Sequence, residues 1–192
     1  MKKGRLLELI SLGEGLNIEF KQSRNKLNKD VFDSVCAFLN RNGGHLFLGL
    51  DADGNVVRID IDSIDKIQMN FVTSMNNPIK MSPTFYLTVE EIEIGDKVIL
   101  YIFVPERSQV HRCNGKIYDR NEDGDLDITD NTNLVARLYM RKQSTYTENK
   151  IFPFVDMNDL EIENFVKVRK LASNQKANHP WNSMENLELG EL

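Results

Sequence analysis

Apolar and polar residues alternate along this chain with two different periods, and each period predicts a type of element. Residues 4–12 carry apolar side chains at helical intervals, whereas residues 17–23 alternate apolar and polar positions as strands do. A second helical stripe runs from Asn28, the expected N-cap, to Arg41. Residues 45–50 are mostly apolar, which is typical of a strand buried on both faces.

The second half of the chain continues the mixture of helices and strands. A helix is predicted over residues 62–77, where apolar side chains recur at helical spacing before a proline. Two strands flank Gly95–Asp96, which favours a hairpin turn. A short strand at 115–120, a helix at 132–142 and a last helix at 158–173 complete the order. This order predicts an α+β fold with a mixed β-sheet and flanking helices.

The length fits one domain with an appendage. The 192 residues are 41% hydrophobic and 28% charged, which excludes wholesale disorder. We expect a domain over residues 1–152, and a C-terminal helix with the start of a linker or following domain over residues 153–192. The apolar pattern that begins near residue 183 is unfinished, which indicates a piece of a longer protein.

The apolar runs and the cysteines predict a cytoplasmic location. The longest apolar runs are too short to cross a membrane, and the N-terminus is a poor signal peptide. Cys36 and Cys113 are the only cysteines and fall in different contexts. We therefore expect free thiols in a reducing cytoplasm and no membrane partner.

The net charge of −5 is unevenly distributed. Residues 119–130 contain six acidic residues and one arginine, so this segment carries the whole net charge. Residues 1–50 contain eight Lys or Arg and five Asp or Glu, a local excess of positive charge. The basic N-terminal part and the acidic segment therefore need separate explanations.

Three charged residues, Glu14, Glu19 and Lys21, lie close together, and Asp51 and Asp53 follow the next predicted strand. Glu19 and Lys21 share one face of their strand, because strand side chains repeat every two residues. Carboxylates beside an ammonium group can hold a divalent ion and a phosphate, as metal-dependent nucleases do. An ordinary strand with one polar face has the same pattern, so the spacing alone leaves both interpretations open.

These residues belong to a longer series of motifs in a fixed order. Glu14 and Glu19 are followed by Phe20–Lys21, then by the helix end CAFLNRNGG, the strand end GLDADG and the later segment GKIYDR. Together they resemble the Schlafen-type AlbA-like domain over residues 5–140, a family often described as DNA-binding. The resemblance implies the same α+β fold with a mixed sheet.

The resemblance implies two classes of function. Most bacterial members look like N-terminal modules of transcriptional regulators, so we first expect a module that binds DNA or RNA mainly through phosphates. Other members cleave RNA with a Glu–Glu–Asp cluster, which would be Glu14, Glu19 and either Asp51 or Asp53, with Mg²⁺ or Mn²⁺. The family usually has adjacent aspartates where this chain has Asp51–Ala52–Asp53, which argues against cleavage. A non-catalytic domain that forms homo-oligomers is the third alternative.

Phosphate contacts would come from basic residues in the first fifty positions and from a glycine turn. Lys and Arg neutralise phosphates without reading sequence, and the backbone amides of glycine-rich turns can also bind phosphate. The glycines are expected first of all to end a helix. The candidate contacts are Lys21, Arg24, Lys26, Lys29, Arg41, Gly43 and Gly44.

The acidic segment has the spacing of a calcium loop. Positions 1, 3, 5, 7, 9 and 12 of a twelve-residue frame hold Asp119, Asn121, Asp123, Asp125, Asp127 and Asp130, with Gly124 at position 6. The twelfth residue is Asp rather than the usual Glu, and the preceding segment resembles a strand instead of a helix. An exposed acidic turn and a Ca²⁺ site therefore both remain predictions.

Overall fold

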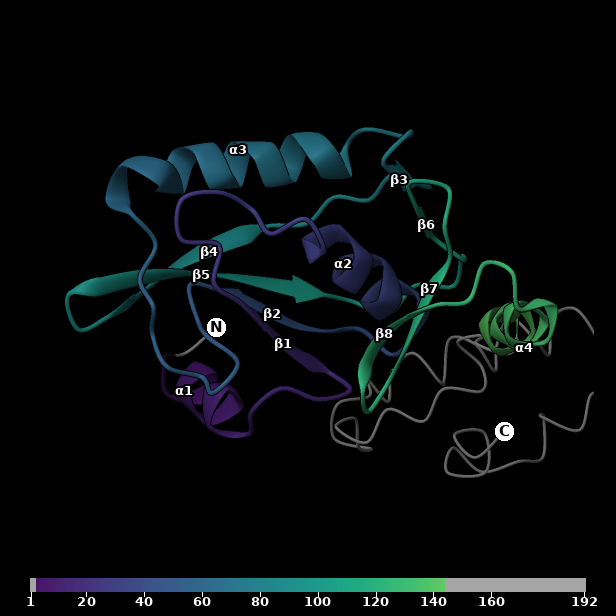
Figure 1. Ribbon diagram of the computed structural model, residues 1–192, viewed down its shortest axis with the longest axis horizontal. Helices are drawn as coiled ribbons and strands as arrows, with labels where there is room; N and C mark the ends of the chain where they lie inside the picture. The colour runs from purple at the N-terminus through teal and green to yellow at the C-terminus, as the bar shows by residue number, and fades with distance from the viewer. Residues whose placement is uncertain (1–2, 144–192) are drawn as a thin grey trace, which may run out of the picture. The chain divides into compact units, whose positions relative to one another are not determined.

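The computed structural model describes residues 3–143, and its elements follow the predicted order (Figure 1). The helices are α1 (Lys3–Ser11), α2 (Val31–Asn40), the short 3₁₀ helix η1 (Ile61–Ser63), α3 (Ile64–Met75) and α4 (Thr132–Gln143). The strands are β1 (Ile18–Lys21), β2 (Gly44–Leu48), β3 (Met81–Ser82), β4 (Val89–Ile94), β5 (Lys97–Val104), β6 (Arg112–Cys113), β7 (Tyr118–Asn121) and β8 (Gly124–Asp127). The expected helix over 158–173 and the expected domain boundary at 152 lie outside the described residues.

The main sheet has the strand order β1-β2-β5-β4. β1 runs parallel to β2, with Glu19 opposite Leu46, and the α2 crossover joins them. β5 runs antiparallel to both β2 and β4, and the β4–β5 pair is the hairpin predicted at Gly95–Asp96. The mixed sheet expected from the sequence is therefore confirmed, as is the α+β fold.

Each face of the sheet packs against its own group of helices. Leu46, Leu48 and Leu100 face α2 and α3 in the larger core, whereas Phe20 and Phe47 face α1 in the smaller one. Successive residues of a strand enter different cores because their side chains point to opposite faces. Glu19 and Lys21, which alternate with Phe20, therefore lie on the α2 face of β1, at the edge of the sheet.

Asn40 joins the end of α2 to two later segments of the chain. Its side-chain amide donates to the carbonyl oxygens of His111 at 2.9 Å and Tyr118 at 2.8 Å, and its oxygen accepts the His111 N–H at 2.7 Å. Asn40 and the His111 side chain are buried. These three bonds satisfy backbone groups that would otherwise be buried without partners.

The start of α2 differs from the prediction. Asp30, not Asn28, is the residue before the helix, and it makes no side-chain cap. The oxygen of the Asn28 side chain instead accepts hydrogen bonds from the backbone N–H and the hydroxyl of Ser23, both at 2.9 Å. Asn28 therefore fixes the loop before α2 rather than the helix itself.

A small hairpin, β7–β8, lies beside α2 (Figure 1). Arg120 and Asp125 are paired across it. Ile117, Ile128 and, from α4, Leu138 form a separate small core. No helix within residues 3–143 is long and apolar enough to cross a membrane.

We predict that Asn40→Ala lowers the free energy of unfolding by about 3 kcal/mol, because it leaves buried backbone groups of His111 and Tyr118 without partners. Urea unfolding of both proteins measures this difference. Asn42→Ala is the matched control, since Asn42 is exposed, and should change stability by less than about 0.5 kcal/mol. Equal effects of the two variants would contradict the role given to Asn40.

Candidate functional site

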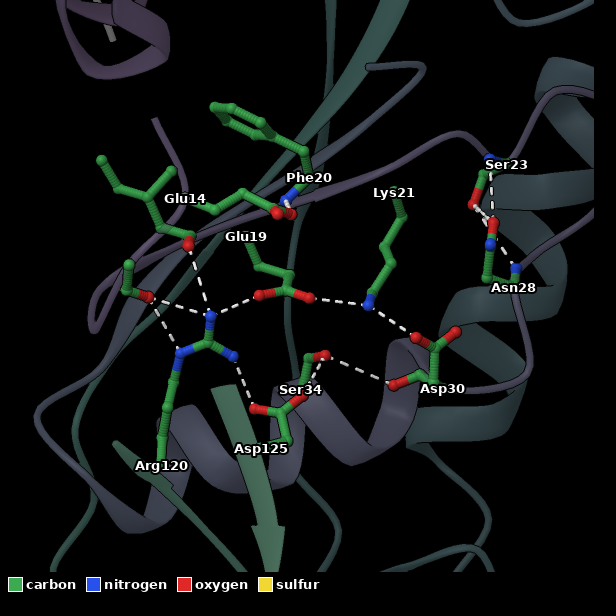
Figure 2. A network of polar contacts seen from close by, with 12 residues as sticks. Glu14, Glu19, Phe20, Lys21, Ser23, Asn28, Asp30, Ser34, Arg120 and Asp125 are labelled. Atoms are coloured by element: carbon green, nitrogen blue, oxygen red, sulfur yellow. Dashed lines mark hydrogen bonds and ion pairs between the residues drawn. The ribbon is translucent and has the colours of Figure 1, made fainter. Parts of the chain in front are cut away.

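A polar pocket of about 420 Å³ lies between β1, the first half of α2 and the β7–β8 hairpin. Its charged lining is mostly acidic. The carboxylates are Glu14, Glu19, Asp30, Asp33, Glu122, Asp123 and Asp125, and the cations are Lys21 and Arg120. The pocket therefore has a negative formal charge, although its two cations are at its centre (Figure 2).

Arg120 is the most enclosed charge in the pocket, with a side chain only 2% exposed. Its Nη2 donates to the carboxylate of Glu19, and its Nη1 donates to Oδ1 of Asp125 at 2.5 Å (Figure 2). Nε and Nη2 also donate to the carbonyl oxygen of Gly15, at 3.0 and 2.9 Å. The planar guanidinium thus links β1, the loop before it and the hairpin.

Lys21 links β1 to the residue that precedes α2. Its Nζ lies 2.6 Å from Oε1 of Glu19 and 2.5 Å from Oδ2 of Asp30. Burial acts to lower the pKa of Lys21, but the hydrogen bonds to Asp30 and Glu19 outweigh it and raise this pKa above its ordinary value. Lys21 therefore stays charged, and both oxygens of Glu19 are held by cations.

Asp125 completes the centre of the pocket. Its Oδ2 accepts a hydrogen bond of 2.5 Å from the Ser34 hydroxyl on α2, while its Oδ1 accepts the hydrogen bond from Nη1 of Arg120. Burial raises the pKa of Asp125, against the lowering effect of Ser34 and Arg120. Ser34 and Arg120 therefore both favour the ionised form of Asp125 against the effect of burial.

The structure brings together three of the five residues predicted as catalytic. Glu14, Glu19 and Lys21 all line the pocket. Glu14 is exposed, and its Oε1 accepts the backbone N–H of Phe20 at 2.8 Å. The expectation that Glu19 and Lys21 share a face of β1 agrees with this arrangement.

Asp51 and Asp53 lie elsewhere. They belong to a tight turn in which Asp51 accepts bonds from the N–H groups of Asp53 and Asn55 at 3.1 and 2.8 Å. The bond from Asn55 is the main cause of a lowered pKa at Asp51. Gly54 of the same turn lies against Phe20 and Ile10, on the α1 side of the sheet. Neither aspartate is among the described residues that line the pocket.

The sequence did not predict this pocket for the three residues at its centre, Arg120, Asp125 and Ser34. Arg120 lay within the recognised GKIYDR segment, but nothing in the local pattern indicated burial. Asp125 was assigned to a calcium loop, and Ser34 appeared as an ordinary helix residue. The one signal for Arg120 is that it is the single base in a strongly acidic segment.

The predicted phosphate contacts separate into three groups. Lys26 and Lys29 are exposed on the loop between β1 and α2, and Arg24 on the same loop pairs with Asp60 at 3.3 Å. Lys21 lies in the pocket, and Arg41 lies 3.5 Å from Asp119. Gly43 and Gly44 are both buried, which disfavours the phosphate contact predicted for them, and that contact stays a prediction.

The two glycines make a tight turn against the core. A Cβ on Gly43, whose φ is +76°, would lie 2.6 Å from the Val104 carbonyl oxygen. A Cβ on Gly44 would lie 2.4 Å from the Phe38 ring. The Gly43 N–H donates to the carbonyl of Phe38 at 3.0 Å, so it completes the helix end instead of facing a ligand.

The segment predicted as a calcium loop forms the β7–β8 hairpin. Its carboxylates point to different partners: Asp119 to Arg141 at 3.1 Å, Asp125 to Arg120, and Asp127 to Lys116 at 2.8 Å. Hydrogen bonds from Lys116 and Thr129 lower the pKa of Asp127 to about 2. In the hairpin Arg120 is opposite Asp125 and Asp119 is opposite Leu126, so Asp119 and Asp125 lie on opposite faces. Their oxygens therefore do not converge as Ca²⁺ coordination requires.

The pocket's donor set also does not fit a divalent cation. No group of three His, Cys, Asp or Glu side chains in residues 3–143 is arranged to hold a metal. Glu19 and Asp125 already surround Arg120, and Glu19 and Asp30 surround Lys21. The protein's own cations thus occupy the positions between the carboxylates that an ion would need.

We predict that Arg120→Ala lowers the free energy of unfolding by about 3 kcal/mol or more at about pH 8, because it removes one partner of two buried ion pairs. Without Arg120, the raised pKa of Asp125 should rise further. A carboxyl with a raised folded pKa makes the fold less stable as the pH rises through that pKa. The stability lost in Arg120→Ala should therefore be smaller at about pH 5 than at about pH 8.

Urea unfolding at both pH values measures the difference between the two proteins. Arg137→Ala is the control, since Arg137 is exposed on α4, and it should show no such pH dependence. A loss in Arg120→Ala that is equal at both pH values would contradict the assignment of Arg120 as the counter-ion.

Comparison with known proteins agrees with this architecture. The family described as Schlafen, AlbA_2 matches residues 14–129, a span that begins at Glu14 and includes the hairpin with Arg120. No curated protein sequence matches the chain.

Two solved structures are similar. The N-terminal domain of a RecG-related protein from Nitrosomonas europaea is 26% identical, with a TM-score of 0.44 over 56% of this chain and 75% of that one. The DIP2311 protein from Corynebacterium diphtheriae is 13% identical, with a TM-score of 0.54 over 97% of this chain and 40% of that one, and it shares the fold. Since the family match covers more than half of the sequence, the chain belongs to the Schlafen AlbA_2 family.

Proposed function

We propose that this domain binds nucleic acid through phosphates, and that the loop between β1 and α2 makes the main contacts. Membership of the AlbA_2 family is consistent with a nucleic-acid-binding domain. The observation that carries the proposal is the exposure of Arg24, Lys26 and Lys29 on one short loop.

This loop is held in shape by its own ends. Ser23 has a φ of +40° and is fixed by two hydrogen bonds to the Asn28 side chain. Lys26 lies between these two residues, and Lys29 directly follows Asn28. A loop with fixed ends presents its charges with less ordering cost when a ligand binds.

The acidic pocket is not proposed as the phosphate site. Seven carboxylates line it, and Lys21 is already engaged by Glu19 and Asp30. A phosphodiester would therefore be repelled from the pocket and attracted to the neighbouring loop. We assign the pocket a different role, which is to hold β1, α2 and the hairpin in one arrangement beside the loop.

Contacts of this kind read phosphates and not bases, so DNA and RNA should both bind. The likeness to N-terminal modules of bacterial transcriptional regulators leads us to propose the same role for this chain, with sequence selection supplied outside this domain. Self-association through a symmetric surface stays a prediction.

We predict that Lys26→Gln/Lys29→Gln weakens binding to duplex DNA and to structured RNA alike, and reduces the slope of log K against log salt by about 2. Fluorescence anisotropy at several salt concentrations measures both quantities. The matched control is Lys116→Gln/Arg137→Gln, which removes two exposed charges from other elements. Equal losses of affinity in the two double variants would show that the loop does not contact the nucleic acid.

RNA cleavage by the pocket is a second candidate. One observation favours it: Glu14 and Glu19, which the family resemblance associates with RNA cleavage, lie together there with Lys21. The contacts of Arg120 and Lys21 with Glu19 oppose it, because they leave no oxygen of Glu19 free of a cation.

We therefore predict no cleavage of transfer RNA in the presence of Mn²⁺ or Mg²⁺, as judged by denaturing gel electrophoresis. The melting temperature should also be the same with Mn²⁺ and with EDTA. Cleavage that Glu19→Ala abolishes would show instead that the pocket is catalytic, and cleavage that survives this substitution would point to a contaminating nuclease.

A further inference from the structure

A second, smaller pocket lies at the other end of α2 from the acidic one. It has a volume of about 190 Å³ and is lined by Thr84, Phe85, Arg107, Ser108, Gln109 and His111. This volume equals roughly six liquid waters, which is enough for a phosphate group. None of the lining residues is acidic.

Arg107 is fixed in this pocket with unused donors. Its guanidinium carbon lies 3.7 Å from the centroid of the Phe85 ring, and its backbone N–H donates to Leu39 at the end of α2. Its Nε is buried and has no hydrogen-bond partner among the described atoms. Within residues 3–143, no carboxylate forms an ion pair with Arg107.

A buried Nε without a hydrogen-bond partner is energetically costly for Arg107. A buried N–H without an acceptor loses its hydration and gains nothing in return. Stacking on an aromatic ring holds the guanidinium plane in one orientation, so its remaining donors are already arranged as a fork. Such a fork matches two oxygens of a phosphate or carboxylate.

The surroundings of Arg107 are polar and positively charged. Burial lowers the pKa of His111, and the nearby charges of Lys142 and Arg107 lower it further. A neighbouring pocket of about 360 Å³ shares Ser108 and Gln109 with the first and is also lined by Lys142. Glu106, the acidic residue next to Arg107 in sequence, lies 3.7 Å from the Lys142 ammonium.

We propose that Arg107, stacked on Phe85 and flanked by Ser108 and His111, forms an oxyanion site that binds a phosphate group. Arg107 supplies the paired donors, and the Ser108 hydroxyl lies at the same pocket for a further bond. The site is separate from the β1–α2 loop and does not depend on the nucleic-acid binding proposed above. The phosphate belongs either to a small phosphorylated compound or to a nucleic-acid backbone.

Isothermal titration of the full chain with inorganic phosphate tests the site. We expect millimolar or tighter binding by the wild type, and at least a tenfold loss in Arg107→Gln, because a charged hydrogen bond is removed. Arg107→Lys keeps the charge but loses the planar fork, so it should also bind more weakly. The matched control is Arg112→Gln, an exposed arginine of β6 that should bind phosphate like the wild type.

A thermal melt of each variant shows whether it is folded. If Arg107→Gln is not folded, Arg107→Lys replaces it as the test variant. Absence of phosphate binding by the wild type, or binding that is unchanged in both Arg107 variants, would overturn the proposal. Anisotropy with duplex DNA then identifies the source of the phosphate. A loss in Arg107→Gln identifies a nucleic-acid backbone, whereas unchanged or absent DNA binding beside Arg107-dependent phosphate binding identifies a small phosphorylated compound.

Discussion

Burying a guanidinium whose side chain is only 2% exposed is costly unless acceptors surround it. Arg120 meets this condition with two carboxylates and the Gly15 carbonyl, which come from three different segments of the chain. Each segment must hold its position for the charge to be compensated. The position of the β7–β8 hairpin against β1 and α2 therefore follows from one electrostatic requirement, with the hydrophobic cores providing the frame around it.

Helix α2 connects the two polar regions described above. Asp33 in its first turn and Asp30 just before it line the acidic pocket, and its Ser34 donates a hydrogen bond to Asp125 there. The carbonyls at its other end accept hydrogen bonds from cations: Lys142 at 3.1 Å from Leu39, and Arg141 at 3.1 Å from Asn40. Positive charge is favourable at a helix C-terminus, which explains why α4 returns two basic side chains to this point.

Much of the fold follows from local patterns in the sequence, but the pocket does not. Alternation along β1 and the helical stripe of α2 were enough to predict both elements and the face that Glu19 and Lys21 share. The partner of Glu19, however, lies 101 residues away in the sequence. No local period can indicate that pairing, and none could place the Asp51 turn on the α1 side of the sheet.

The structure of the acidic segment could not be predicted for a different reason. A calcium loop places its ligands at every second position, and a strand repeats its side chains with the same period. The pattern from Asp119 to Asp123 therefore fits both structures, and a glycine at position 124 suits either bend, with a φ of +114° here. What decides between them is the burial of Arg120 against Glu19, which pairs the segment as a hairpin.

The contact between Glu19 and Arg120 also constrains how this sequence can change over evolutionary time. Loss of Arg120 alone leaves the carboxylates of Glu19 and Asp125 without this counter-charge. Loss of Glu19 alone leaves Arg120 and Lys21 with one counter-charge fewer. Either single step lowers stability before any second change can restore it. The two positions should thus vary together or stay fixed, although they lie at opposite ends of the domain's sequence, and one of them sits on a short surface hairpin where substitutions are otherwise well tolerated.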